Sequence, residues 1–359
     1  MAQPLTQLIR GAAYSAAQTA RIGWYTAQYV AARHIAGPLI APGEVPPASS
    51  FNRVPERVIR EAFLSLVNRE ARDIAAGVYR LPKDIRTAPN PLLLCRQASR
   101  YLEEARRVTR RAYSKGGATE VRDIASEDHL PPYYLQNFHF QTDGWLSDNS
   151  ADIYDTQVEA LFTGVADTMR RRALPCLLKE IDRIRSLERR PVVADIACGT
   201  GRLLRDVVDN RPGIDAVGID LSSAYLKKAA KNVANPRVAL VKGQAEHLPF
   251  DDDSVDILYS VYLFHELPPK VRIEVAREFG RVLKPGGLYV HIDSVQYGDT
   301  PMDIMLENFP RAVHEPYYDS YARQDLNDLF GDSGFVEESS EVGFLTKTNA
   351  YRFRTASRR

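Results

Sequence analysis

A glycine-rich turn in the run VVADIACGTGRLL, Val192 to Leu204, is the first stretch of the chain that could do chemistry. The run reads as a buried strand that breaks into a turn and then opens a helix. Gly199 and Gly201 would let a ligand approach the backbone closely, and the unpaired amides at the start of the helix favour an anionic group. The turn alone leaves phosphate and carboxylate open as that group.

Two phosphate-binding patterns fit this turn poorly. A dinucleotide-binding turn needs a small residue three positions after its second glycine, where this chain has Leu204. A Walker-type loop needs Gly-Lys followed by Ser or Thr, which the turn lacks. Asp220 closes the next predicted strand, in AVGIDLS, where a carboxylate can accept hydrogen bonds from both hydroxyls of a ribose. We therefore expect a ligand that carries a ribose.

The elements that would position these residues are those of a doubly wound α/β domain. Short apolar runs alternate with amphipathic helical spacings, as in a parallel sheet that is covered on both faces. The chain ends in two extended runs without a helical spacer, which predicts an antiparallel hairpin near the sheet edge. Ligands of such sheets bind at the carboxyl ends of the strands. The five predicted parallel strands are 191–197, 215–220, 237–242, 255–260 and 287–293.

Four motifs in this region resemble the successive motifs of class I S-adenosylmethionine-dependent methyltransferases. They are DIACGTGR, GIDLS, GQAEHLPFDDDSVDILYS and REFGRVLKPGGLYVHIDS. The likeness is greatest to the branch that includes the ubiquinone and menaquinone biosynthesis methyltransferases (methyltransferase type 11). The resemblance implies a Rossmann-like seven-stranded sheet with the C-terminal hairpin, S-adenosylmethionine as the cofactor, and a glycine turn that faces the methionine carboxylate instead of a phosphate.

The resemblance also implies roles for individual residues. Asp195 would lie near the methionine amino group, and Asp220 would hold the ribose. Gln244 stands where the family often has Asp, and its amide oxygen can still accept a hydrogen bond from the adenine amino group. The other expected contacts are the backbone cradle, Ala197, Gly199 and Gly201; the wall and loop around the adenine, Leu221, Ala245 and Glu246; and the residues along the sulfonium, Ser260 and Tyr262.

Methyl transfer from a sulfonium is an in-line displacement, so orientation of the acceptor supplies most of the rate enhancement and a base is optional. If the acceptor is a phenol or another hydroxyl, a histidine can remove its proton. His265 in LFHEL is our candidate for that base, with a helix-capping role as the alternative, and Asp293 is a second catalytic candidate. His291 alternates with apolar neighbours and is predicted to be structural. His265 has no second histidine four positions on, so we expect no metal site.

The predicted acceptor is a small, hydrophobic molecule, such as a quinone precursor, a polyketide or a lipid, by analogy with the family. Nucleic-acid methyltransferases of this fold carry an Asn/Asp-Pro-Pro-aromatic motif after the fourth strand, where this chain has SVYLFHEL, so no nucleic-acid partner is expected. One alternative is a non-catalytic S-adenosylmethionine-binding assembly or regulatory protein. Another is a nicotinamide oxidoreductase, which Leu204 disfavours.

Composition narrows the class of protein further. The 359 residues are 44% hydrophobic and carry a formal net charge of +1, which fits a globular chain without a global field for nucleic acid. Cys95, Cys176 and Cys198 lie far apart, which argues against a disulfide framework and for the cytoplasm. No run is long and apolar enough to predict a membrane-spanning helix. The oligomeric state stays open.

The chain is predicted to divide into three regions: an Ala-rich helical segment with a linker (1–48), a helical accessory or lid domain (49–185) and the S-adenosylmethionine-binding domain (186–359). Within the first two, we expect a linker at 37–50, helices over 55–80 and 91–114, and a helix that ends near Met169 with Asn149 or Ser150 as its N-cap. Trp145 and Tyr154 are predicted either to cover the pocket or to pack between domains.

The first 43 residues carry three arginines and no acidic residue. Three interpretations stay open for this segment: an Ala-rich helix packed on the rest of the protein, an interfacial helix that makes peripheral membrane contact through residues 1–40, and a transit peptide. The arginine runs 170–172 and 189–190 are predicted to lie on solvated helix faces.

Overall fold

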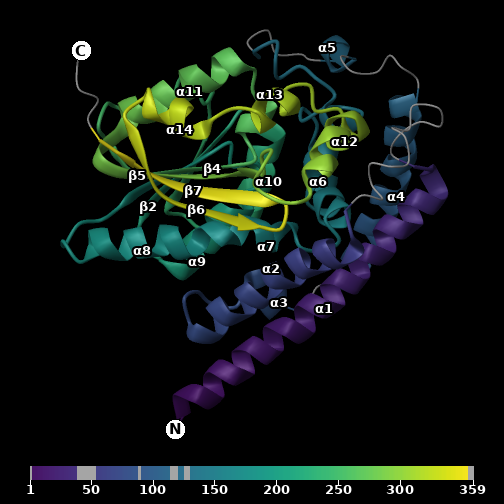
Figure 1. Ribbon diagram of the computed structural model, residues 1–359, viewed down its shortest axis with the longest axis horizontal. Helices are drawn as coiled ribbons and strands as arrows, with labels where there is room; N and C mark the ends of the chain where they lie inside the picture. Colours follow the sequence, from purple (N-terminus) through teal and green to yellow (C-terminus); the bar gives the residue numbers. More distant parts are fainter. Residues whose placement is uncertain (1, 39–53, 88–89, 114–119, 125–129, 355–359) are drawn as a thin grey trace. The chain divides into compact units, whose positions relative to one another are not determined.

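The computed structural model describes residues 2–38, 54–87, 90–113, 120–124 and 130–354 (Figure 1). The chain forms two compact units. A helical unit consists of Met1–Met169 and Ile304–Glu315, and an α/β unit consists of Arg170–Asp303 and Pro316–Arg359. The three regions predicted from the sequence stay a prediction. Within the described ranges, no helix is both long and apolar enough to cross a membrane.

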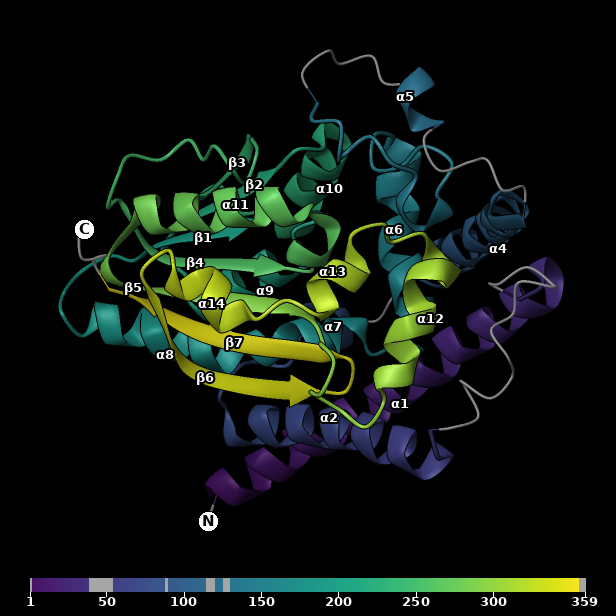
Figure 2. The same ribbon diagram turned by 45° about the horizontal axis from the view of Figure 1, so that its top comes forward.

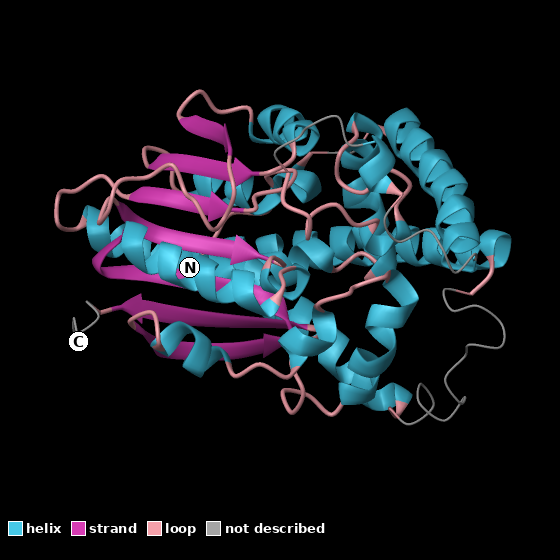
Figure 3. Ribbon diagram, turned by 90° about the horizontal axis from the view of Figure 1, so that it is seen from above, coloured by secondary structure: helices cyan, strands magenta, loops and turns pink. Residues whose placement is uncertain are grey.

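The α/β unit contains a seven-stranded sheet in the order β3-β2-β1-β4-β5-β7-β6. Strands β1 to β5 pair in parallel, and β7 runs antiparallel to both β5 and β6. Figure 3 shows one strand reversed among strands whose arrowheads point the same way. This confirms the predicted doubly wound, Rossmann-like sheet with its C-terminal hairpin. The strands are β1 (Val192–Ile196), β2 (Asp215–Asp220), β3 (Val238–Lys242), β4 (Val255–Val261), β5 (Leu283–Ser294), β6 (Phe335–Gly343) and β7 (Thr346–Phe353).

Helices cover both faces of this sheet, with α8 and α9 below it and α11 and α14 above it in Figure 1. Each helix buries an apolar stripe; α8, for example, buries Leu177, Leu178 and Ile181. The helices of this unit are η3 (Arg171–Ala173), α8 (Leu174–Arg185), α9 (Arg202–Asn210), α10 (Ser223–Val233), η4 (Phe264–Glu266), α11 (Pro269–Val282), α13 (Tyr318–Ala322) and α14 (Leu326–Gly331).

Leu204 fits behind the glycine turn because β2 has a glycine opposite it. A Cβ atom on Gly218 would lie only 2.8 Å from Leu204 Cδ2 and 2.9 Å from Cys198 Sγ. The small residue that a dinucleotide-binding turn carries on its helix is therefore on the neighbouring strand here. Close packing of helix and strand is kept, although Leu204 departs from the dinucleotide pattern.

The helical unit is built around α1, which packs against α2, α4 and α6. Figure 2 shows α1 crossing alongside α2. The helices predicted over 55–80 and 91–114 are confirmed. The helices of this unit are α1 (Ala2–Ala36), α2 (Glu56–Ala76), α3 (Lys83–Arg86), α4 (Pro91–Tyr113), α5 (Val121–Ile124), η2 (Phe138–Phe140) and α6 (Asp148–Leu161). Two more cross its limits: α7 (Ala166–Arg170) and α12 (Asp303–Val313).

Three details of the helical prediction need correction or fall outside the structure. The N-cap of α6 is Ser147, whose side chain accepts from the Ser150 amide, and not Asn149 or Ser150. The helix predicted to continue to Met169 is interrupted after Leu161, and α7 begins at Ala166. Most of the predicted linker, residues 39–50, lies outside the described residues.

The prediction that Arg170, Arg171 and Arg172 are solvated is wrong, because all three are buried. Carboxylates replace the lost water: Arg172 Nε lies 3.0 Å from Glu341 Oε1. Arg171 Nη1 lies 3.7 Å from an oxygen of Asp206. The periodic pattern of a helix cannot show which acids the sheet brings toward its basic residues.

Candidate functional site

The glycine turn joins β1 to α9 through three residues with left-handed backbone conformation. The φ angles are 59° at Ala197, 54° at Gly199 and 72° at Gly201. Glycine adopts this conformation at little cost, whereas Ala197 is strained by it, and such strain is concentrated at functional sites. Gly201 is the N-cap of α9, so the first amides of that helix follow the turn directly.

The two glycines of the turn are required for different reasons. A Cβ atom on Gly201 would lie 2.9 Å from Val233 Cγ2 and 3.1 Å from Ala229 Cβ, both on α10. A Cβ atom on Gly199 would meet only a ring carbon of Tyr225, at 4.0 Å. Gly201 therefore permits the turn to pack on α10, while Gly199 leaves space at the turn that a ligand could use.

Asp220 at the end of β2 fixes the geometry of the same turn. Its Oδ2 accepts from the Gly199 amide at 2.8 Å, and its Oδ1 accepts from the Ser222 amide at 2.8 Å. Burial raises the pKa of Asp220 to about 6, against the opposing effect of these two hydrogen bonds. Each carboxylate oxygen keeps a second lone pair, which is what a ribose diol needs.

Asp195, the residue before the end of β1, is a buried acid whose Oδ1 has no hydrogen-bond partner among the described residues. Burial and the charge of Asp220 raise its pKa well above the ordinary value. An unsatisfied buried carboxylate is costly, and an ammonium group beside it would remove that cost. Asp195 therefore fits the amino group that the sequence analysis assigns to it.

The predicted adenine contacts follow the ends of β2 and β3. Leu221 comes directly after Asp220 and is half-buried. Gln244 forms an isolated antiparallel bridge with His247, which closes a short loop. Ala245 and Glu246, between them, are buried. Their contacts with an adenine stay predictions.

Ser260 and Tyr262 lie at the carboxyl end of β4. Ser260 Oγ is buried and lies 2.9 Å from Tyr289 Oη. Tyr262 has a φ angle of 55°, and its hydroxyl lies 2.5 Å from Thr346 Oγ1. The Arg170 guanidinium lies 6.0 Å from the Tyr262 ring centroid. Tyr262 thus combines a left-handed backbone conformation with side-chain contacts at its hydroxyl and at its ring.

His265 and Asp293 form a pair at the carboxyl ends of β4 and β5. Asp293 Oδ1 lies 2.5 Å from His265 Nδ1, and Asp293 also accepts from the amides of Phe264 and Ser294. Burial would raise the pKa of Asp293, but the His265 charge and these hydrogen bonds hold it below its ordinary value. An ionised Asp293 favours the proton on Nδ1. His265 Nε2 lies 3.6 Å from Glu266 Oε1.

Tyrosines that the sequence analysis did not assign to the site surround this pair. The Tyr318 and Tyr321 rings, both from α13, lie 5.7 Å and 6.1 Å from the His265 ring, centroid to centroid. Tyr318 Oη also lies 2.5 Å from Ser294 Oγ. The only sequence feature that could have indicated these contacts is the tyrosine-rich run YYDSY. Nothing in the sequence places that run next to β5.

His291 is engaged inside the core, in agreement with its predicted structural role. Its Nδ1 lies 3.0 Å from Tyr289 Oη and its Nε2 lies 3.1 Å from Tyr321 Oη. Burial lowers the pKa of His291 to about 4, so the ring is neutral near pH 7. In the helical unit, Trp145 stacks on Phe138 with ring centroids 4.3 Å apart, and its covering role stays a prediction.

The sheet order, the strained glycine turn and the acid that closes β2 define an α/β domain built to bind a nucleoside at its carboxyl edge. Residues 193–287 match the family model described as a methyltransferase domain. This segment therefore belongs to the class I S-adenosylmethionine-dependent methyltransferase domains, whose cofactor is S-adenosylmethionine.

The chain is also similar to named methyltransferases and to a solved structure. A demethylmenaquinone methyltransferase of Chlorobaculum tepidum is 34% identical over 145 residues, 40% of this chain and 55% of that protein. A sterol 4-C-methyltransferase of Caenorhabditis elegans is 30% identical over 111 residues, 30% of this chain and 33% of that protein. The crystal structure of an S-adenosylmethionine-dependent methyltransferase of Aquifex aeolicus is 18% identical and covers 48% of this chain and 89% of that one, with a TM-score of 0.36. The chain spans about half the length of the curated relatives it matches.

Proposed function

We propose that this protein is a methyltransferase that transfers a methyl group from S-adenosylmethionine to a small, hydrophobic acceptor. The observation that carries the proposal is the turn held by Asp220, with open space at Gly199 and a buried, unsatisfied oxygen of Asp195. The relatives named for demethylmenaquinone and for a sterol support a lipophilic acceptor. A quinone precursor, a polyketide or a lipid fits this class.

The chain's own residues would hold each part of the cofactor. Asp195 would pair with the methionine amino group and the turn at Gly199 would face the carboxylate. Asp220 would accept from the ribose hydroxyls. S-adenosylmethionine supplies an electrophilic methyl group on its sulfonium. The remaining predicted contacts are Leu221, Gln244, Ala245 and Glu246 around the adenine, and Ser260 and Tyr262 along the sulfonium.

His265 would act on the acceptor, and Asp293 would position His265. The proton of the acceptor hydroxyl would move to His265 Nε2, because Asp293 holds the other ring nitrogen. The tyrosines around His265 form the aromatic surroundings that suit a flat, apolar acceptor. We therefore propose transfer to oxygen.

A location in the cytoplasm belongs to the same proposal, with free Cys95, Cys176 and Cys198 as its support. So does a peripheral contact with the membrane, where a lipophilic acceptor would be dissolved.

Comparison of metabolites between a deletion strain and its parent tests the proposed activity. We expect the strain to accumulate a lipophilic compound that is lighter by one CH2 unit than the missing product. The purified protein should then convert that compound and release S-adenosylhomocysteine. Binding of S-adenosylmethionine without turnover of any accumulated compound would instead indicate a non-catalytic binding protein.

A further inference from the structure

A network of buried hydrogen bonds joins β4, β5 and α13. Ser260 Oγ lies 2.9 Å from Tyr289 Oη, and Tyr289 Oη lies 3.0 Å from His291 Nδ1. His291 Nε2 lies 3.1 Å from Tyr321 Oη, and Tyr321 donates to the Ser294 carbonyl at 3.1 Å. The first four of these residues are at most 1% exposed. Buried polar groups keep the hydrogen bonds that their neighbours offer, because bulk water does not compete.

The donors and acceptors of this network are fixed from its Ser294 end. A carbonyl oxygen can only accept, so the single hydroxyl proton of Tyr321 goes to Ser294. Tyr321 must then accept from His291, which places the imidazole proton on Nε2. Burial lowers the pKa of His291 to about 4, so its ring is neutral at pH 7 and Nδ1 carries no proton.

The polarity set at Tyr321 continues along the network to Ser260. His291 Nδ1 accepts from Tyr289, which uses the only hydroxyl proton of Tyr289. Tyr289 must therefore accept from Ser260. Because its proton points to Tyr289, the Ser260 oxygen can only accept from any further group. Two tyrosines and a histidine thus decide which hydrogen bonds Ser260 can make.

Ser260 lies at the point of the sheet where a nucleoside is expected. It is the register partner of Ile196, the last residue of β1, and the glycine turn follows Ile196 directly. The sheet order places β2 on one side of β1 and β4 on the other, and the crevice of a doubly wound sheet opens at such a switch point. An oxygen that only accepts suits a cation or a polarised C–H group there.

We propose that Tyr289, His291 and Tyr321 are positioning residues that keep Ser260 an acceptor toward the sulfonium of S-adenosylmethionine. The sulfonium is positive and polarises the C–H bonds of its methyl group, so an acceptor oxygen stabilises it. S-adenosylhomocysteine, the product, has a neutral sulfur with its own lone pairs and is stabilised less. The network therefore favours binding of the substrate over the product. This role rests on the proposed function, in which the crevice holds the cofactor.

The position of the His291 proton is tested without any ligand. Nitrogen NMR of the full-length protein with labelled histidines distinguishes the two neutral tautomers, and His291→Gln identifies the His291 signals among those of the seven histidines. We expect the proton on Nε2 in the parent protein. In Tyr321→Phe we expect it on Nδ1, because the variant removes the acceptor of the Nε2–H group. A proton on Nδ1 in the parent would overturn the proposal.

Calorimetry of the intact protein with S-adenosylmethionine and S-adenosylhomocysteine tests the preference. The measured quantity is the ratio of the two dissociation constants. Tyr289→Phe and Tyr321→Phe keep the ring and should each reduce the preference for S-adenosylmethionine about threefold to tenfold, since Ser260 can then turn its proton toward the sulfonium. Loss of affinity for both ligands by the same factor would contradict the proposal. If the parent binds neither ligand, the proposed function fails as well.

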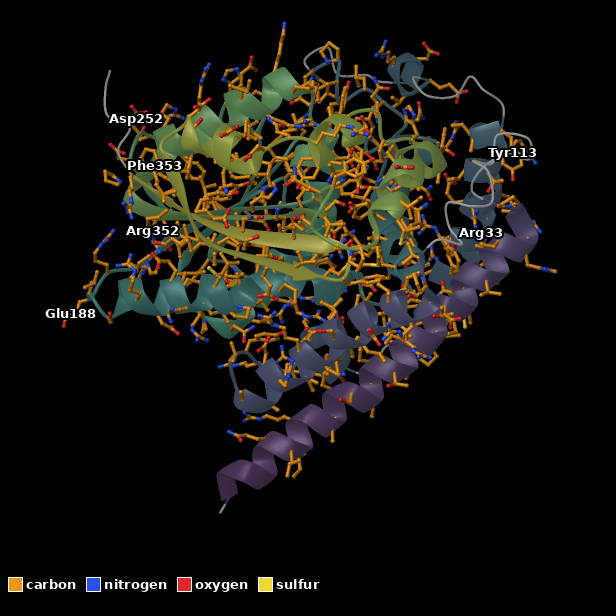
Figure 4. All side chains as sticks on the ribbon, viewed as in Figure 1. Arg33, Tyr113, Glu188, Asp252, Arg352 and Phe353 are labelled. Carbon is orange, nitrogen blue, oxygen red and sulfur yellow. The ribbon has the colours of Figure 1, made fainter. Side chains whose placement is uncertain are left out.

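Tyr351→Phe is the matched control for these variants. Tyr351 directly precedes Arg352, which Figure 4 labels, and its ring stacks on Tyr289 with centroids 6.1 Å apart. Its buried hydroxyl has no hydrogen-bond partner among the described residues, so the ratio should stay that of the parent. In the Ser260→Ala protein, Tyr321→Phe should not change the ratio further, because the network no longer ends at an oxygen. An equal effect of Tyr321→Phe with and without Ser260 would contradict the proposal.

Discussion

At the scale of single residues, Asp220 serves both the turn and the proposed ribose contact. Its pKa of about 6 lies above the ordinary aspartate value, so the carboxylate that accepts ribose hydrogen bonds is lost as the pH falls through 6. We predict that S-adenosylmethionine affinity weakens from pH 7 to pH 5. Asp220→Asn should weaken binding by roughly 1 to 3 kcal/mol at pH 7 and remove that pH dependence. Calorimetry of the parent and the variant between pH 5 and pH 7 measures both effects. The same pH dependence of the affinity in both proteins would contradict the role of Asp220.

His265 and Asp293 are tested by turnover once an acceptor is available. His265→Gln should lower kcat by about 10² to 10⁴ while S-adenosylmethionine binds as before, because the ring acts on the acceptor. Asp293→Asn should have a smaller effect in the same direction, since it alters the orientation of His265. A variant as fast as the parent would show that the acceptor needs no base, as expected for a thiol or an amine.

Sequence reasoning predicts which residues form the site, but it does not predict the contacts that the structure shows between them. Motif order assigned Asp220 to the end of β2, and the structure has it there. The hydrogen bond from Gly199 to Asp220 spans 21 residues, and the contact of His265 with Asp293 spans 28. Such pairs depend on strand register, which local patterns do not specify. Tyr318 was missed for the same reason.

At the scale of elements, the turn between β1 and α9 offers a matched pair of variants. Gly201→Ala should destabilise the fold by about 1 to 3 kcal/mol, because the new methyl would overlap Val233 and Ala229. Gly199→Ala has space within the protein and adds mainly backbone strain, of about 1 kcal/mol. We expect Gly199→Ala to lose more cofactor affinity than its thermal unfolding explains. Equal losses of stability and affinity in both variants would contradict distinct roles for the two glycines.

At the scale of the whole molecule, the start of the α/β unit depends on whether α8 is assigned to it. The sequence predicts a boundary at 185/186, because the hydrophobic pattern changes from helical to strand period there. In the structure, α8 packs against α9, β4 and β5, and Ile181 is fully buried. Long-range packing of an amphipathic helix leaves no local mark in the sequence that would assign it to one domain or another.

Ile181→Ala therefore tests the contribution of α8 to the α/β unit. We predict a loss of about 2 to 5 kcal/mol in the unfolding transition that S-adenosylmethionine stabilises. Lys179→Ala, on the exposed side of the same helix, should change that transition by less than about 0.5 kcal/mol. If both variants have the same free energy of unfolding as the parent protein, the packing of α8 on the sheet does not stabilise this unit.

Calorimetry of the intact protein with S-adenosylmethionine, S-adenosylhomocysteine and NADH is the most direct test of the central claim, that the carboxyl edge of this sheet binds a sulfonium nucleoside. The account predicts saturable heat with the first two, none with NADH, and a large loss of affinity in Asp220→Asn. Binding of NADH, or no heat with either sulfur nucleoside, would contradict it.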